Sequence, residues 1–365
     1  MTTPPHLDTL RRHALARSLF APTTLPAALR RLGFVQADPL RAPAKAQDLI
    51  LRHRVRDYVA GDLERRYPQL AVEEDYFVNH GFMPRGLQAL MHPRTPRRVW
   101  DEARWQQAGA VLEIVRHLGV AHPREVDAAL GLGTVGNWFG GRSRASTELL
   151  DGLLHRGRLR VARRDGGTRL YALRDDPPEA VDNPLTALDA LLDLILQTYA
   201  PLPAPSLTQL AGLLLRDGVP QWRHLRETAL QRARARWPSA EVEGLRWYWP
   251  DGEDPTRTRR HAPERVCLLA PFDPVVWDRR RFELFWDWAY RFEAYVPAAQ
   301  RQRGHYALPL LWRDQVIGWA NLKVEQGRLL AETGYVAARP VEAAFTQALD
   351  EELVRLQHFL GLQGS

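Results

Sequence analysis

The tripeptide Gln36-Ala37-Asp38 places an amide and a carboxylate two residues apart. In an extended segment, residues i and i+2 share a face, so both side chains are expected to point the same way. Pro39 favours this geometry, because the residue before a proline is disfavoured in the helical region. Such a pair can hold one water molecule: Gln36 orients it, and Asp38 accepts its proton or faces a developing cation. The same spacing is also typical of a solvated polar pair in a loop, so the surrounding elements are needed to distinguish a catalytic site from such a loop.

Short helices surround the tripeptide. Apolar residues recur at helical spacing on both sides of it, and the predicted helices are 7–20, 25–32 and 44–51. A strongly basic stretch follows, in which Arg52 and Arg54 are candidates for contact with an anionic partner. Residues 1–110 are therefore predicted to form a winged-helix-like region that carries Gln36 and Asp38.

The next region has the clearest fold pattern. Helices are predicted over about 105–118, 123–130 and 143–156. Two basic strands follow, joined by Asp165-Gly166-Gly167, a turn typical of β-hairpins. This order predicts a winged helix over residues 111–178, whose third helix would enter a DNA groove while the hairpin contacts phosphates. The candidate DNA contacts are Arg142, Arg144, Arg163, Arg164 and Arg169, with a merely solvated basic face as the alternative.

The remaining chain is predicted to form two further regions. Proline-rich residues 174–184 are predicted to be a linker, and residues 184–262 repeat the helical scheme more loosely. The aromatic residues Trp247, Tyr248 and Trp249 close that region; packing in the core is favoured over stacking on nucleic acid. Residues 263–365 change to a period of two, with strands predicted over 291–296, 306–312, 315–323 and 328–332 and a last helix over 340–360. The predicted fold class is α+β: tandem winged-helix motifs, then a small antiparallel β-barrel, with a curled sheet as the alternative, and a C-terminal helix.

Composition narrows the class of protein. Of 365 residues, 45% are hydrophobic and 25% charged, as in an ordinary globular protein, and no run approaches the ~18 apolar residues of a membrane span. The N-terminus lacks the basic segment followed by an apolar one that is typical of a signal peptide. The protein is therefore predicted to be cytoplasmic, at the nucleoid. A net charge of +7 favours an anionic partner such as nucleic acid. However, all basic residues except Lys45 and Lys323 are arginines or histidines, a bias that a GC-rich genome also produces.

Cysteine and histidine usage argues against a metal site. The lone cysteine, Cys267, lies in an apolar strand-like run and is predicted to be a buried structural thiol. The 12 histidines show no spacing typical of metal ligands. His80 is a weaker candidate for the site, and a satisfied buried histidine is the favoured interpretation. No metal and no cofactor are predicted.

The chain resembles the bacterial tandem winged-helix DNA glycosylases of the AlkX/AlkZ kind, which unhook interstrand crosslinks. The likeness spans nearly the whole chain in the expected order. It is carried by Phe34-Val-Gln-Ala-Asp38, Ala270-Pro-Phe-Asp-Pro-Val-Val-Trp-Asp-Arg279, Tyr290-Arg-Phe-Glu-Ala-Tyr-Val-Pro297 and Tyr306-Ala-Leu-Pro309. The resemblance implies winged-helix motifs braced by a β-barrel around an open DNA cleft. One branch of the family carries Gln-x-Gln; the other carries Gln-x-Asp and a broader alkylation-repair role, and Asp38 is similar to the second.

The chemistry of the tripeptide suits this resemblance. Alkylation at guanine N7 makes the base a cationic leaving group, so a strong general acid is unnecessary. The oxocarbenium-like transition state then needs a nearby negative charge and a water at C1′, which Asp38 and Gln36 would supply. Because Lys45 is the only lysine near the motif, a Schiff-base lyase step is not expected. In the Ala270–Arg279 motif, Phe272 and Trp277 are predicted to belong to the core.

The favoured prediction is thus a monofunctional glycosylase that acts as a monomer on double-stranded DNA with alkylated bases, including interstrand crosslinks, and leaves an abasic site. The alternative is a non-catalytic winged-helix DNA-binding protein or transcription regulator. A regulator would tolerate Asp38→Asn, whereas the glycosylase would not.

Overall fold

The computed structural model describes residues 5–96, 99–131, 133–136, 142–174, 181–257 and 264–362. The chain divides into two compact units, and each is assembled from segments that are separate in sequence. The first contains Met1–Leu63, Leu191–Ala211 and Thr228–Ser365; the second contains Glu64–Ala190 and Gly212–Glu227. The sequence prediction of four consecutive regions divides the chain differently.

In the first unit, α1 (Leu7–Ser18) and α2 (Leu25–Leu32) precede the predicted site segment. α2 buries one apolar face and ends at Gly33, whose φ of 78° favours glycine. Close packing gives a second reason for glycine, since a Cβ at this position would lie 2.6 Å from Leu194 Cδ1. The chain leaves the helix in an extended conformation as β1 (Val35–Gln36).

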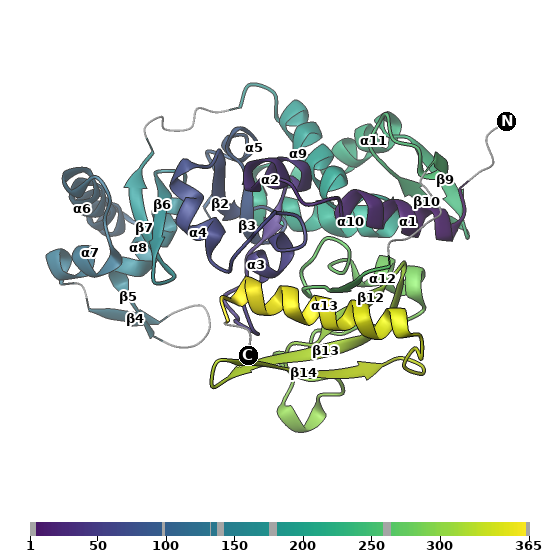
Figure 1. Ribbon diagram of the computed structural model, residues 1–365. Helices are drawn as coiled ribbons and strands as arrows, with labels where there is room; N and C mark the ends of the chain where they lie inside the picture. The colour runs from purple at the N-terminus through teal and green to yellow at the C-terminus, as the bar shows by residue number, and fades with distance from the viewer. Residues whose placement is uncertain are drawn as a thin grey trace. The chain divides into compact units, whose positions relative to one another are not determined.

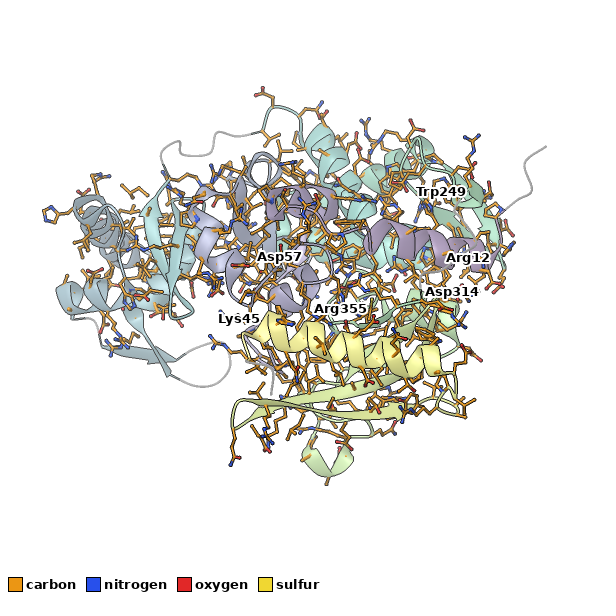
Figure 2. The ribbon with its side chains drawn as sticks, in the orientation of Figure 1. Arg12, Lys45, Asp57, Trp249, Asp314 and Arg355 are labelled. Atoms are coloured by element: carbon orange, nitrogen blue, oxygen red, sulfur yellow. The ribbon has the colours of Figure 1, made fainter. Side chains whose placement is uncertain are left out.

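Arginines of α1 attach this helix to the C-terminal part of the same unit. Arg11 Nη1 donates a hydrogen bond to the backbone oxygen of Phe285 at 3.1 Å. The Arg12 guanidinium lies 3.9 Å from Asp314 Oδ2, at a turn between two strands (Figure 2). Contacts between the two ends of the chain therefore stabilise the first unit.

The C-terminal sheet is antiparallel and open. Its strand order is β11-β12-β13-β14, with β11 at Val266–Leu268, β12 at Leu308–Trp312, β13 at Gln315–Glu325 and β14 at Arg328–Tyr335. Of the two predicted forms, the barrel is not found among the described residues and an open sheet is: β11 and β14 each pair with a single neighbour in this sheet, and a closed barrel requires every strand to have two. The strand predicted over 291–296 is also absent, because that segment turns, with Val296 N donating to Glu293 O at 3.0 Å.

The C-terminal helix α13 (Ala343–Leu360) packs on this sheet, as its apolar spacing predicts (Figure 1). Its buried face includes Phe345, Leu349, Leu356 and Phe359. Phe345 meets Trp312 of β12 edge to face, with 5.6 Å between ring centroids. Burial of such large apolar side chains is the main source of stability for the sheet.

A second aromatic cluster joins α12 (Arg279–Trp286) to a small sheet of order β8-β10-β9. Trp247 is fully buried and stacks on Phe285 with centroids 5.5 Å apart. Tyr248 and Trp249 are also buried, so the prediction that these three aromatics belong to the core is confirmed.

In the second unit, three helices precede a hairpin in the predicted order. These elements are α6 (Glu102–Leu118), α7 (Pro123–Leu130), α8 (Ala145–His155), β6 (Leu159–Asp165) and β7 (Thr168–Leu173). They share one apolar core, and Ala121 forms an isolated antiparallel bridge with Tyr171 beside the hairpin. A feature that the sequence analysis missed is a short hairpin between α7 and α8, formed by β4 (Thr134–Gly136) and β5 (Arg142–Arg144).

The remaining elements complete the two units. The other helices are α3 (Ala46–Leu51), α4 (Asp62–Arg66), α5 (Arg85–Ala89), α9 (Pro184–Tyr199), α10 (Ala204–Leu213) and α11 (Arg226–Arg236); the other strands are β2 (Val72–Tyr76), β3 (His80–Pro84), β8 (Leu202–Pro203), β9 (Ser239–Val242) and β10 (Leu245–Tyr248). Residues 175–180 of the predicted linker lie outside the described part of the chain. Within the described part, no helix has the length and apolar character needed to cross a membrane.

Candidate active site

Gln36 is held by an aromatic side chain from the far end of the chain. Its side chain is buried, and Trp277 Nε1 donates a hydrogen bond to Gln36 Oε1 at 2.7 Å. An indole N–H can only donate, so the partner atom must be the amide oxygen. This contact fixes the amide orientation, and the Nε2 end of Gln36 therefore points away from the indole.

Asp38 lies in the extended segment that follows β1 and is half-buried. Its Oδ1 accepts a hydrogen bond from the backbone N–H of Leu40 at 2.9 Å, a local contact that orients the carboxylate. The backbone N–H of Asp38 donates to Gln47 Oε1 of α3 at 3.4 Å. Together these contacts fix both the segment and its carboxylate.

Tyr306 lies two residues before the start of β12. Its side chain is within electrostatic range of Asp38. Its side chain is buried; burial raises the pKa of the phenol, and the negative charge of Asp38 raises that pKa further. The phenol is therefore neutral at physiological pH. Two aromatic side chains of the C-terminal part are thus related to the residues that the sequence singled out: Trp277 to Gln36 and Tyr306 to Asp38.

A cavity of about 940 Å³ opens beside Tyr306. It is lined by the chain that follows Asp38, by the loop before β12, and by strands β13 and β14; the residues include Arg41, Pro43, Gly304, His305, Tyr306 and Lys323. Tyr306 belongs both to this cavity and to the surroundings of Asp38. The cavity therefore lies close to the segment that follows Asp38, although Asp38 itself does not line it.

Residues of the Ala270–Arg279 motif contact the candidate site or stabilise the elements around it. Asp273 is fully buried and forms a bidentate ion pair with Arg54. Asp278 caps α12, with Oδ1 accepting from Arg281 N at 3.2 Å. Trp277 is half-buried rather than fully in the core, and it contacts Gln36 directly. The sequence analysis missed this contact; the Trp277 position within a motif shared with the resembled family was the signal that could have found it.

We expect Trp277→Phe to weaken catalysis without unfolding the protein. The substitution keeps an aromatic ring but removes the indole donor, so the buried Gln36 amide loses a partner, a change that costs about 1–3 kcal/mol. If Gln36 acts in the reaction, the single-turnover rate should fall by roughly 10-fold. Trp286→Phe is the matched control, because the Trp286 indole donates to the backbone oxygen of Asp314. Equal rates for wild type and Trp277→Phe would contradict a role for this contact.

Two of the predicted DNA contacts are occupied inside the first unit. Arg54 is fully buried, with Nη1 2.7 Å from Asp273 Oδ2. Arg52 has a side chain only 3% exposed and pairs with Glu352. A basic stretch in sequence is thus largely internal in structure, because acidic partners on distant elements neutralise it. Arg54 and Arg52 are therefore no longer proposed as DNA contacts.

Arg164 and Arg169 of the hairpin are also engaged, in this case by Glu74 of β2. Arg164 Nη2 and Arg169 Nε lie 2.5 Å and 2.6 Å from Glu74 Oε1. His80 Nε2 lies 2.9 Å from the same oxygen. Burial alone would raise the pKa of Glu74, but Arg169, His80 and Arg164 hold it well below its usual range. These arginines therefore fix the hairpin to β2, and their prediction as phosphate contacts is corrected accordingly.

The other basic candidates differ in their surroundings. Arg163 is exposed on β6. Arg144 is exposed and pairs with Asp127. Arg142 and Arg144 lie on β5 rather than on the third helix, which begins at Ala145.

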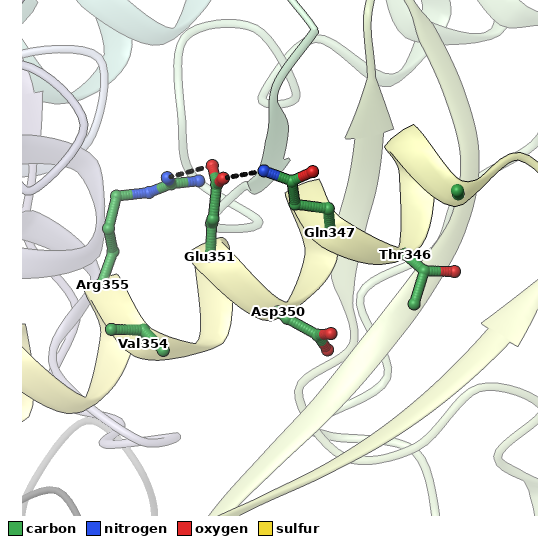
Figure 3. Close-up of a pocket in the computed structure, with 7 residues that line it drawn as sticks. Thr346, Gln347, Asp350, Glu351, Val354 and Arg355 are labelled. Carbon is green, nitrogen blue, oxygen red and sulfur yellow. Dashed lines mark hydrogen bonds and ion pairs between the residues drawn. The ribbon is translucent and has the colours of Figure 1, made fainter.

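The following features lie outside the predicted site. A surface hollow along α13 is lined by residues of that helix alone, with Glu351 between Gln347 and Arg355 (Figure 3). Cys267 is buried, and burial raises the pKa of its thiol to about 11, as expected for a structural cysteine. Among the described residues, no group of three His, Cys, Asp or Glu side chains is arranged to hold a metal.

Comparison with known proteins defines the class. The model of the AlkZ-like DNA glycosylase family matches residues 29–359, a range that includes Gln36, Asp38, Trp277 and Tyr306. The chain belongs to this family. Its structure is also similar to that of the Streptomyces sahachiroi DNA glycosylase AlkZ, with a TM-score of 0.63 and 15% identity over 99% of this chain and 98% of the other. Family membership supports DNA glycosylase activity with DNA as the partner, and the structural likeness shows a shared fold.

Proposed function

We propose that this glycosylase hydrolyses the N-glycosidic bond of N7-alkylated guanine, in monoadducts and interstrand crosslinks, and leaves an abasic site. The observation that carries the proposal is that hydrogen bonds fix Gln36 and Asp38, two residues apart, and that Arg41 and Pro43, which follow them closely, line a cavity of about 940 Å³. A cationic base needs little help to leave. The site has to stabilise the positive charge that develops on the sugar and to deliver water.

In the proposed mechanism, the bond between C1′ and the base nitrogen breaks, and its electron pair leaves with the base. Asp38 lies beside the sugar, stabilises the oxocarbenium-like transition state, and accepts a proton from the attacking water. Gln36 orients that water through its amide nitrogen, because Trp277 occupies its oxygen. Water oxygen then forms the new bond to C1′, and the products are the free base and an abasic site.

The proposal includes monofunctional action as a monomer. A lyase step needs an amine nucleophile, and the chain contains only two lysines, Lys45 and Lys323. Lys45 precedes α3, and Lys323 forms an ion pair with Glu325. The proposed mechanism assigns no role to either lysine and includes no Schiff base.

The experiment uses a duplex with a single N7-methylguanine and a second duplex with an N7-linked interstrand crosslink. Wild-type protein should produce strand cleavage only after alkali treatment in the first and should separate the strands of the second. Cleavage without alkali, or a covalent adduct trapped by borohydride, would contradict monofunctional action. Activity on the monoadduct alone would contradict the crosslink part of the proposal.

We propose that α6 to β7 form a winged helix that contacts the DNA backbone. Three helices followed by a hairpin support this, together with the bridge between Ala121 and Tyr171. Arg163 is the hairpin arginine best suited for a phosphate, because it is exposed whereas Arg164 and Arg169 pair with Glu74. Arg144 and Arg142 of β5 remain proposed contacts beside it.

We expect Arg163→Gln to weaken binding to all duplexes alike and to reduce the slope of log K against log salt by about 1, the effect of losing one phosphate contact. Arg164→Gln, the neighbouring change, should leave this slope unaltered. It should instead lower the thermal midpoint, because Glu74 loses one of its partners. Fluorescence anisotropy at several salt concentrations and thermal unfolding measure the two effects. The reverse pattern would show that Arg164, not Arg163, contacts phosphate.

A further inference from the structure

The hydroxyl group of Tyr306 is one of several buried polar groups in the described part of the first unit that lack a hydrogen-bond partner, and Tyr306 also lines the cavity. Tyr306 is 3% exposed, and its hydroxyl has no hydrogen-bond partner among the described residues. A buried hydroxyl without a partner is destabilising, so such groups are rare in native proteins and call for an explanation. Nearby Tyr290 shows the usual situation, since its hydroxyl donates to the backbone oxygen of Ala307 at 2.7 Å.

The loop that carries Tyr306 is rigidly held. Glu293 accepts hydrogen bonds from the backbone N–H groups of Gln302 at 3.0 Å and Arg303 at 2.8 Å. Asn321 Nδ2 donates to the backbone oxygen of Arg303 at 2.6 Å. Gly304 has a φ of 115°, and a Cβ there would lie 2.4 Å from Asn321 Oδ1. These contacts thus fix the loop around Gly304, where the backbone packs most closely against Asn321.

The Tyr306 ring is fixed as well. It packs edge to face on Phe292, with 5.3 Å between centroids. The hydroxyl is therefore preorganised, and its position relates it to two features: the charge of Asp38 and the cavity lined by Arg41, Pro43 and His305. Arg41 and Pro43 follow Asp38 closely in the chain and line the same cavity as Tyr306.

We propose that Tyr306 is a further catalytic residue, whose hydroxyl oxygen accepts one O–H of the attacking water while Asp38 accepts the other. This inference rests on the proposed glycosylase function of Gln36 and Asp38. A water molecule forms four hydrogen bonds in tetrahedral directions. With both protons directed at Asp38 and Tyr306, and one lone pair at the amide nitrogen of Gln36, the remaining lone pair faces C1′.

The proton balance is simple. The water proton directed at Asp38 is transferred as the new bond to C1′ forms, and the electron pair of the broken bond leaves with the alkylated base. Tyr306 neither gains nor loses a proton. Its neutral hydroxyl serves as a hydrogen-bond partner that orients the nucleophile.

The test is the single-turnover rate of base excision by Tyr306→Phe on a duplex with one N7-methylguanine. We expect a 10-fold to 100-fold loss, roughly the lower range for a positioned polar group. DNA affinity should not change, and the thermal midpoint should stay the same or rise, because no hydrogen bond within the protein is lost and an unpartnered buried hydroxyl is removed. Tyr335→Phe is the matched control: it removes another buried hydroxyl without a partner among the described residues, on β14, and should keep the wild-type rate.

A double-mutant cycle separates a catalytic role from a structural one. If Tyr306 and Asp38 hold the same water, Tyr306→Phe should slow Asp38→Asn by less than about 3-fold, because coupled groups are not additive. Independent, multiplied losses would overturn the proposal, as would a wild-type rate for Tyr306→Phe while Asp38→Asn is inactive. The latter result would leave the proposed function intact. Inactivity of the wild type itself would instead overturn the proposed function and, with it, the role of Tyr306.

Discussion

Asp38→Asn should reduce the rate of base excision by roughly 10²–10³-fold, the scale for removing one preorganised electrostatic contact. The substitution keeps the size of the side chain and an oxygen that can accept the hydrogen bond from Leu40 N. It removes the negative charge that would face the oxocarbenium-like sugar and the acceptor of the water proton. The single-turnover excision rate on a duplex with one N7-methylguanine measures the loss.

Binding to the same duplex should be nearly unchanged, since the charge acts mainly in the transition state. Asp57→Asn provides the matched control. Asp57 is exposed and has a φ of 51°, a conformation that asparagine tolerates well, so this change should leave the rate at its wild-type value. A rate for Asp38→Asn within about 3-fold of wild type would be incompatible with a catalytic carboxylate at this position.

The second large effect concerns stability. Arg54→Met should destabilise the first unit by about 3–5 kcal/mol, because it leaves the buried Asp273 carboxylate without its charged partner. The two guanidinium–carboxylate distances are 2.7 Å and 2.9 Å, and Arg54 also donates to the backbone oxygens of Ser18 and Ile50. The arginine therefore ties α1, α3 and the Ala270–Arg279 motif together.

The thermal midpoint of unfolding measures this effect, with Arg56→Gln as the control, since Arg56 is exposed two residues away. The double variant Arg54→Met with Asp273→Asn should be less destabilised than the sum of the single variants, because both charges are then absent. If Arg54→Met instead weakened DNA binding at an unchanged midpoint, the assignment of Arg54 to the interior would fail.

Local sequence pattern predicted the individual elements well where one physical signal dominated. α2 and α7 have the predicted bounds, because apolar spacing, Pro26 or Pro123 near the start and Gly33 or Gly131 at the end all agree. The hairpin at Asp165-Gly166-Gly167 formed as predicted, since its glycines supply the positive φ that the turn requires.

Long-range pairing is what the sequence could not reveal. Arg54 and Asp273 are 219 positions apart, and Arg164 and Glu74 are 90 apart. A count of basic residues cannot distinguish an arginine that contacts DNA from one that neutralises a buried carboxylate. The same limit applies to Gln36, whose spacing from Asp38 suggested chemistry but whose contact with Trp277 depends on the fold.

The barrel prediction failed for a related reason. A period of two predicts strands but not their closure, and the segment 291–296, in which Phe292 alternates with charged Arg291 and Glu293, does not form a strand. The family resemblance, by contrast, joined motifs that are far apart in sequence: of the residues that carried it, Trp277 contacts Gln36, and Tyr306 lies within electrostatic range of Asp38.

Hydrolysis by Gln36 and Asp38 is tested most directly by following the release of free base with mass spectrometry, from a duplex with one N7-methylguanine under single-turnover conditions. We expect free 7-methylguanine and an unbroken strand with an abasic site for wild type, and background release for Asp38→Asn. If wild type binds N7-methylguanine and N7-crosslinked duplexes tightly but releases no base from either, the proposed hydrolysis by Gln36 and Asp38 is contradicted.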